Sequence, residues 1–220
     1  KTTYLAALDK LGNRYYIKQK WKASAMVYRE ILSLTGDVED AVEYAHRLFE
    51  SITQGKLYKR GERDVAALIR VLRRRYYNAA LSAKKRRKLF KQFEKYTRFI
   101  ATKLQDVANE RKDEDIYLRA AAAYKSYLTF FGKAAKASDV RANLAEVLYS
   151  AKRYMEAARY YELAAKGQSG KTQKESVYTA VVAYFEALKL KGKRRLSHLD
   201  VVQARAGLRR AGKVYIRLFP

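Results

Sequence analysis

The chain contains no cysteine and a single proline, Pro220, in 220 residues. The absence of cysteine excludes disulfides, thiolate metal sites and cysteine nucleophiles, but it assigns no compartment. Because proline interrupts helices from within, a sequence whose one proline stands at position 220 allows helices throughout. The 49% hydrophobic content argues against wholesale disorder. These features favour an all-α fold with a substantial buried core.

Residues that usually carry catalysis are also scarce. Only two histidines are present, His46 and His198, and neither has a second histidine at metal-ligand spacing. Ser197, His198 and Asp200 lie within one helical turn, whereas a catalytic triad assembles in space, so a helix cap is the simpler interpretation. No glycine-rich phosphate loop occurs. The sequence therefore predicts that the protein is not an enzyme and holds no metal and no cofactor.

Acidic residues are few beside basic ones. The chain has 22 Asp and Glu against 48 Lys and Arg, a formal net charge of +26. Such an excess attracts polyanions, so we expect an acidic partner. No run of about 18 apolar residues is present, and no transmembrane insertion is expected. The compartment stays open between the bacterial periplasm or cell envelope and the cytoplasm, and the oligomeric state stays open as well.

Two stretches far apart in the chain share one spacing of small and large side chains. The first consists of Leu11, Gly12, Tyr15, Trp21, Ser24, Tyr28 and Ile31. The second, at the same steps, consists of Leu144, Ala145, Leu148, Tyr154, Ala157, Tyr161 and Ala164. This spacing predicts two antiparallel helices of about a dozen residues each, with small residues where the backbones approach closely.

The shared spacing resembles the tetratricopeptide repeat, whose signature reads large, Leu, Gly, Tyr, then small, aromatic, Ala. The resemblance implies an all-α, right-handed α-α superhelix of about five helical hairpins, a solenoid that holds another molecule. We expect a single domain over 1–220. Within it, the clearest repeats lie at 5–36 and 138–171, the middle at 37–137 is degenerate, and 172–220 forms a C-terminal hairpin.

Helix ends are indicated by caps. Gly36 is a predicted helix stop, after which Asp37 or Asp40 opens the next helix. Ser82 is a predicted N-cap for a longer amphipathic helix. The acidic run that begins at Asp113 suits the first turn of another helix, because carboxylates favour the positive end of the helix dipole.

Basic residues gather in two clusters. Between Lys56 and Lys103 the chain has seventeen Lys and Arg against three acidic residues, a local net charge of +14. The second cluster, near the C-terminus, includes Lys193 and continues at steps of four from Arg205 to Arg217, which places these residues on one helix face. The predicted polyanion-binding residues are Arg73, Arg74, Arg75, Lys84, Lys85, Arg86, Arg87, Lys88, Arg194, Arg195, Arg209, Lys213 and Arg217. The alternative is that these charges are ordinary solvated faces.

Aromatic residues offer a related alternative. Several of the nineteen tyrosines occupy packing positions of the repeat pattern. Tyr76 and Tyr77 instead follow directly after the arginine triplet. Exposed aromatic rings beside arginines stack on bases in proteins that bind single strands, so this pair is a candidate for that role.

The resemblance also implies a place for the partner. Members of the family bind an extended peptide or a helix in a groove lined by the first helix of each hairpin. The non-packing positions of those helices give the groove candidates Asn13, Lys18, Arg47, Arg141 and Asn143. One subset of the family grips a C-terminal carboxylate with Lys and Asn four residues apart. Asp9 stands here in the lysine position with the wrong charge, so this clamp is not carried over.

Two functions remain after catalysis is set aside. The first is a protein–protein interaction scaffold whose strongly basic surface docks an acidic protein or peptide, with a bacterial cell-envelope assembly as one setting. The alternative is a helical-repeat protein that binds RNA or DNA through the basic clusters. The sequence does not choose the partner.

Overall fold

The computed structural model describes residues 2–35 and 40–219, without the side chains of Thr2 and Lys193. The described chain is all-helical, with no strand, as the sequence predicts. It contains ten α-helices, which are α1 (Thr2–Ile17), α2 (Trp21–Leu34), α3 (Asp40–Gln54), α4 (Gly61–Tyr76), α5 (Ala83–Arg111), α6 (Glu114–Phe131), α7 (Ala137–Ser150), α8 (Tyr154–Ala165), α9 (Gly170–Leu188) and α10 (His198–Leu218). Short 3₁₀ turns at Tyr58–Arg60 and Gly192–Arg194 complete it.

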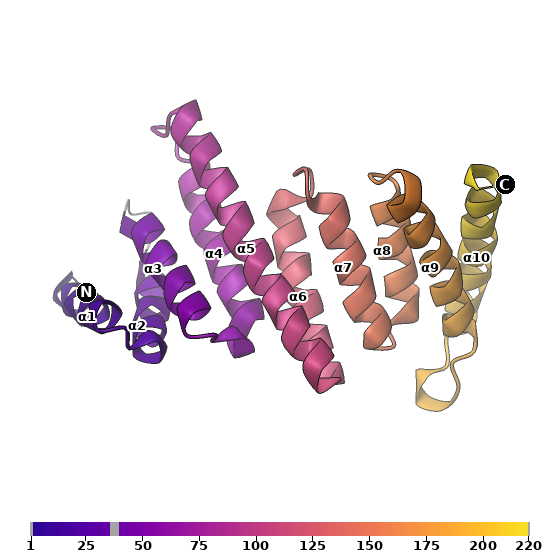
Figure 1. Ribbon diagram of the computed structural model, residues 1–220, viewed down its shortest axis with the longest axis horizontal. Helices are drawn as coiled ribbons and strands as arrows, with labels where there is room; N and C mark the ends of the chain where they lie inside the picture. Colours follow the sequence, from indigo (N-terminus) through magenta and orange to yellow (C-terminus); the bar gives the residue numbers. More distant parts are fainter. Residues whose placement is uncertain (1, 36–39, 220) are drawn as a thin grey trace. The chain divides into compact units, whose positions relative to one another are not determined.

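Contacts divide the chain into two compact units, unit 1 at residues 1–107 and unit 2 at residues 108–220. Within unit 1, α2 contacts α1, α3 and α4, and α3 contacts α4. Within unit 2, helices α6 to α10 pack in chain order, each on the next (Figure 1). Neighbours in sequence are therefore neighbours in space inside each unit, the arrangement expected of stacked helical hairpins.

Several predicted helix starts agree with the structure. Asp113 caps α6, and its carboxylate accepts hydrogen bonds from the amides of Asp115 and Ile116. Ser197 caps α10 by accepting from the amide of Asp200. α3 begins at Asp40. The predicted stop at Gly36 and the alternative start at Asp37 lie outside the described residues.

One turn recurs after α1, α3 and α7. Gln19, Lys56 and Lys152 adopt left-handed backbone conformations with φ of 53°, 52° and 57°. In the first turn the amide of Gln19 donates to the carbonyl of Tyr16 and the next amide to that of Tyr15, both at 2.9 Å, and the other two turns repeat this pattern. It is the Schellman motif, which usually places glycine at the left-handed position. Gln19 and Lys152 also stand at the same place in the two predicted repeats.

The repeat positions with small residues are buried, as the spacing predicts. Ser24, Ala145 and Ala157 are fully buried. Leu11 differs from its counterpart Leu144, because it remains 38% exposed whereas Leu144 is fully buried. At this repeat position α1 therefore contributes less to the core than the pattern implies.

In unit 2, close approach of α9 and α10 depends on Gly207. A β-carbon built at Gly207 would lie 2.4 Å from Cζ of Tyr184, whose side chain is 2% exposed. The tyrosine ring occupies the space that any other side chain would need. By contrast, a β-carbon at Gly212 on the same helix meets no atom within 4 Å.

These two glycines predict opposite responses to alanine. Gly207→Ala should lower the free energy of unfolding by about 1–3 kcal/mol, because the new methyl group overpacks a buried ring. Gly212→Ala should raise it by about 0.5–1 kcal/mol, because alanine has the higher helix propensity. Chemical denaturation of both variants measures the difference. Equal effects of the two substitutions would contradict the close packing of Tyr184 on Gly207.

Candidate functional site: basic surfaces and a cavity in unit 2

The predicted groove residues Asn13 and Arg47 are brought together in unit 1. Nη1 of Arg47 donates to Oδ1 of Asn13 at 3.0 Å and to the hydroxyl of Tyr28 at 3.1 Å, while Nε donates to Glu43 at 2.9 Å. The guanidinium also lies 5.7 Å from the ring centre of Tyr16. Arg47 is therefore already bonded on several sides, and these bonds tie α1, α2 and α3 together.

A polar network that the sequence does not predict continues from this arginine. Tyr16 donates to Glu50, whose carboxylate lies 3.5 Å from Nε2 of His46. Nδ1 of His46 is 2.6 Å from the hydroxyl of Tyr96, which accepts from Gln92 at 2.7 Å. The network joins α1, α3 and α5 within unit 1. Tyrosine and glutamate are common on helix surfaces, so nothing in the sequence indicates that Tyr16, Glu50 and Tyr96 meet around His46.

The other three groove candidates are placed differently. Nη2 of Arg141 in α7 donates to the carbonyl of Gly132 at 2.6 Å, which satisfies the end of α6. Lys18 is exposed in the turn after α1, and Asn143 is half-buried on α7. Arg141 therefore serves the chain's own backbone, and Lys18 keeps a free surface position.

The arginines at the end of α4 divide into exposed and engaged side chains. Arg73 is exposed, and Nη1 of Arg74 donates to the carbonyl of Thr35 at 3.0 Å. Arg75 lines a hollow of about 370 Å³ together with basic Lys85 and Lys88 and acidic Asp40 and Glu43. The triplet is therefore not one uniform cationic patch.

Arg86 is a structural residue within the predicted basic cluster. Its Nη2 donates to the carbonyls of Asn78 and Leu81, at 3.4 and 3.0 Å, and its guanidinium lies 5.8 Å from the ring centre of Tyr76. These contacts hold the connection between α4 and α5. Tyr77, beside Tyr76, is 72% exposed.

The rest of the cluster forms a row along α5. The row steps by four, three and four residues, which keeps its members on one helix face. We name it the α5 ladder, and it consists of Lys84, Lys88, Lys91 and Lys95, all exposed. Arg87 is exposed beside the row. None of these five side chains forms an ion pair with a carboxylate of the described residues. Lys91 and Lys95 were not among the predicted residues, although helical spacing from Lys84 would have found them.

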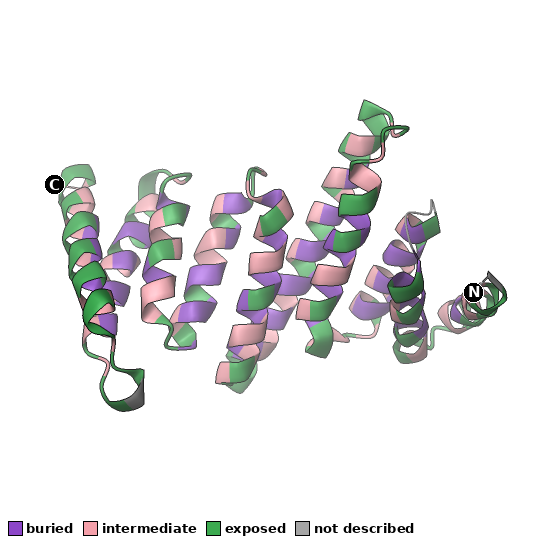
Figure 2. Cartoon of the chain, turned by 180° about the vertical axis from the view of Figure 1, so that it is seen from behind, coloured by how far each residue is buried: buried purple, intermediate pink, exposed green. Residues whose placement is uncertain are grey.

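A second row runs along α10 in unit 2. The α10 ladder consists of Arg205, Arg209, Lys213 and Arg217, and all four are exposed. Within the described part of the chain, none of them pairs with a carboxylate. Figure 2 shows exposed residues along the outer face of this helix.

The other C-terminal candidates are partly neutralised. Nη2 of Arg194 donates to both carboxylate oxygens of Glu114 at 2.8 Å, and this hydrogen bond lowers the pKa of Glu114. Arg195 is exposed. The side chain of Lys193 lies outside the described part of the structure. Charge in this loop is therefore weaker than the sequence implies.

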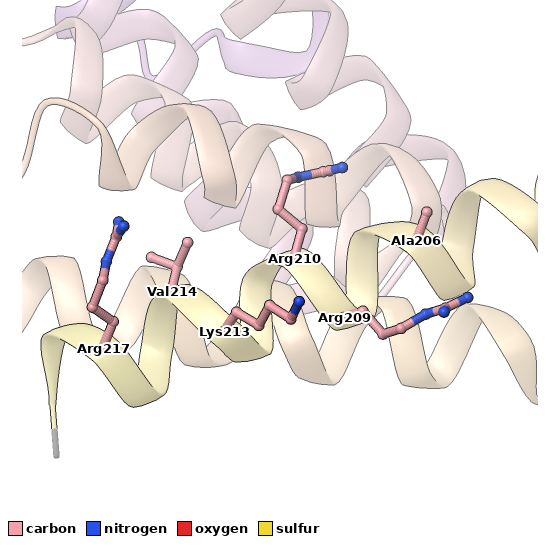
Figure 3. Close-up of a pocket in the computed structure, with 6 residues that line it drawn as sticks. All are labelled: Ala206, Arg209, Arg210, Lys213, Val214 and Arg217. Carbon is pink, nitrogen blue, oxygen red and sulfur yellow. The ribbon is translucent and has the colours of Figure 1, made fainter.

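A cavity of about 630 Å³ lies beside the α10 ladder, between α8, α9 and α10. Its apolar lining includes Leu163, Val177, Val214 and Leu218. Its basic residues are Arg159, Lys166, Arg210 and Arg217, and Glu162 is its acidic residue. A second hollow on α10 shares Arg210, Val214 and Arg217 (Figure 3). Sequence reasoning found Arg217 among these cations. It singled out neither Arg159 and Lys166 nor the apolar lining, because the cavity is formed by three helices.

Two further observations bear on chemistry. Among residues 2–35 and 40–219, no three His, Asp or Glu side chains gather as a metal site would require. No described helix is both long enough and apolar enough to cross a bilayer.

Buried phenols predict a pH response. Burial and the hydrogen bond to Glu50 raise the pKa of Tyr16 to about 12, and burial also raises the pKa of Tyr161 and of Tyr184. A raised folded-state pKa contributes stability that is present below pH 10, the ordinary value, and is lost as the pH rises through the folded-state value.

Absorbance titration of phenolate should therefore show a class of tyrosines that ionises only above pH 11. The contribution of these buried tyrosines to the free energy of unfolding should fall between pH 10 and 12. Tyr16→Phe should remove one phenol from the late class. Ionisation of all nineteen tyrosines near pH 10 in the folded protein would contradict this result.

Comparison with known proteins gives no family: no protein-family model and no curated protein matches the chain.

Proposed function

We propose that the chain is a non-catalytic scaffold of tetratricopeptide-like hairpins, wound as a right-handed superhelix, whose basic surface docks an acidic partner protein. The observation that carries this proposal is the α10 ladder, four exposed cations without a carboxylate partner among the described residues. Like charges at neighbouring helical positions cost a few tenths of a kcal/mol per pair. An acidic partner would offset that cost.

The hairpin part of the proposal is supported by backbone geometry. The same Schellman turn after α1, α3 and α7 joins each first helix to its second with identical hydrogen-bond spacing. Two of these turns fall at corresponding places of the two repeats inferred from side-chain spacing. Agreement between side-chain pattern and turn geometry favours repeated units over unrelated helical pairs.

Docking of a protein is favoured in unit 2, because cations there adjoin exposed apolar side chains. Interfaces between proteins place an apolar centre inside a polar rim. Leu163 and Leu218, which line the cavity beside Arg217, are 42% and 40% exposed. Arg47, Asn13 and Arg141 support the proposal less, since their side chains are bonded within the chain.

The α10 ladder provides the test. Affinity capture from a nuclease-treated lysate should recover an acidic protein, and its binding to the double variant Arg209→Glu, Lys213→Glu should weaken at least tenfold. The control, Lys133→Glu with Lys171→Glu, makes the same change in net charge elsewhere in unit 2. Equal losses of affinity in both double variants would overturn the proposal. Capture of the acidic protein only from lysate that has not been treated with nuclease would also overturn it.

The α5 ladder specifically favours nucleic acid as a second candidate. In the described stretch from Lys84 to Lys95, no large apolar side chain is exposed, so this surface would bind a partner through its charge. About four phosphate contacts would lower the affinity for duplex DNA roughly 10²-fold between 50 and 200 mM salt.

A gel-shift titration tests this second candidate. Changing Lys88, Lys91 and Lys95 to Gln should weaken binding and flatten the salt dependence. The matched control changes three exposed cations of unit 2, Lys133, Lys136 and Lys171, to Gln. If both triple variants bind nucleic acid equally well, the α5 ladder is an ordinary solvated face and not a binding site.

A further inference from the structure

Helices α8 and α10 are joined across α9 by polar bridges. Arg159 donates to Oε1 of Gln203 at 2.6 Å, and Arg210 donates to both oxygens of Glu162 at 2.9 and 2.8 Å. The hydroxyl of Tyr184, on α9, donates to the same carboxylate at 2.8 Å. The earlier residue of α8, Arg159, contacts the earlier residue of α10, Gln203, and the later residues Glu162 and Arg210 contact each other. The two helices therefore run in the same direction. Both carboxylate oxygens of Glu162 thereby accept hydrogen bonds from the chain's own donors.

Beyond the last bridge the two helices leave the cavity open. Lys166 and Arg217 stand at this end, and neither pairs with a described carboxylate. Figure 3 shows Arg210, Val214 and Arg217 projecting from one side of α10, with the valine between the two arginines. The open end of the cavity is therefore apolar within and cationic at its edge.

Helix-dipole stabilisation explains only part of this arrangement. Lysine and arginine in a last helical turn are favoured by the negative end of the dipole in any protein. That effect accounts for Lys166 and Arg217. It does not account for Leu163 and Leu218, which remain 42% and 40% exposed on the same side. Leaving such leucines in water forgoes the favourable burial of their apolar area.

We propose that this cavity seats one face of an acidic amphipathic helix from a partner protein. The inference rests on the proposed function and names its site and the chemistry of its partner. Apolar side chains of the partner enter between Leu163, Val177 and Val214. Its Asp or Glu residues, one turn to either side, meet Lys166 and Arg217.

Size and composition both favour this occupant. The stretch of α10 from Arg210 to Leu218 is about 12 Å long, which matches about two turns of a helix. A volume of about 630 Å³ admits a few side chains but not a whole helix, so only one face enters. A nucleic-acid backbone would leave the apolar lining without a partner, whereas an amphipathic helix covers it and satisfies the cations.

The probe is a helical peptide of about 14 residues, four turns, with leucines along one face and glutamates beside them. Its binding to the full chain is measured by fluorescence anisotropy in 50 and 200 mM salt. We expect saturable binding that persists at the higher salt, because burial of leucine is not screened. A peptide of equal charge with serine in place of leucine should bind at least tenfold more weakly.

Matched variants locate the site. Leu163→Gln and Arg217→Gln should weaken peptide binding about tenfold and about threefold to tenfold, respectively. Leu199→Gln and Lys133→Gln are the controls, since both residues are exposed in unit 2 and neither lines the cavity. Circular dichroism should show the same helicity in all four variants, so that loss of binding is not loss of folding.

The outcomes separate this inference from the proposed function. If the cavity variants bind the peptide as tightly as the controls, the cavity inference is wrong while docking of acidic proteins on the ladder survives. Should neither the peptide nor any acidic protein bind, and RNA bind instead, both are wrong. Tight binding of dodecanoate with no binding of the peptide would show that the cavity belongs to a small amphiphile and would also overturn the inference.

Discussion

Close approach of helices at small residues is the constraint on which much of this structure depends. On α10, Gly207 leaves the space that the ring of Tyr184 fills, and on α1 a β-carbon at Gly12 would already lie 3.1 Å from Cζ of Tyr28. Both tyrosines are almost fully buried. A small residue facing a large ring packs densely while the helix backbones stay near each other. Tyr184 also holds Glu162, so the packing that closes α9 on α10 places the bridge beside the cavity.

The large positive charge is distributed unevenly once the chain is folded. Arg47, Arg86 and Arg141 bind carbonyls or side chains of the chain itself, where a guanidinium satisfies several acceptors at once. The cations of the two ladders, by contrast, face solvent and form no ion pair with a carboxylate of the described residues. Their neighbours differ as well, since the α10 ladder adjoins exposed leucines, whereas no large apolar side chain is exposed from Lys84 to Lys95. This difference is the physical basis for assigning a protein partner to one and considering a nucleic acid for the other.

The family resemblance anticipated a groove on the first helices, and the candidates there are largely occupied. Asn13 and Arg47 bind each other, and the neighbouring network around His46 links α1, α3 and α5. These bonds order that surface of unit 1. The apolar opening lies instead in unit 2, where α8 and α10 flank α9 and where Lys166 and Arg217 pair with no carboxylate of the described residues.

The sequence by itself determined the all-helical class, the helix start near Asp113, the cap at Ser197 and the row of cations on one face of α10, because these depend on local spacing and on interactions within one turn. The sequence did not predict the left-handed conformations of Gln19 and Lys152, because neither residue type favours that conformation. Only the tertiary structure decided which cations are free and where apolar side chains remain open. The ion pair of Arg210 with Glu162 joins α10 to α8, and the cavity lining combines Leu163, Val177 and Val214 from three helices. No local sequence pattern shows that these helices lie next to each other.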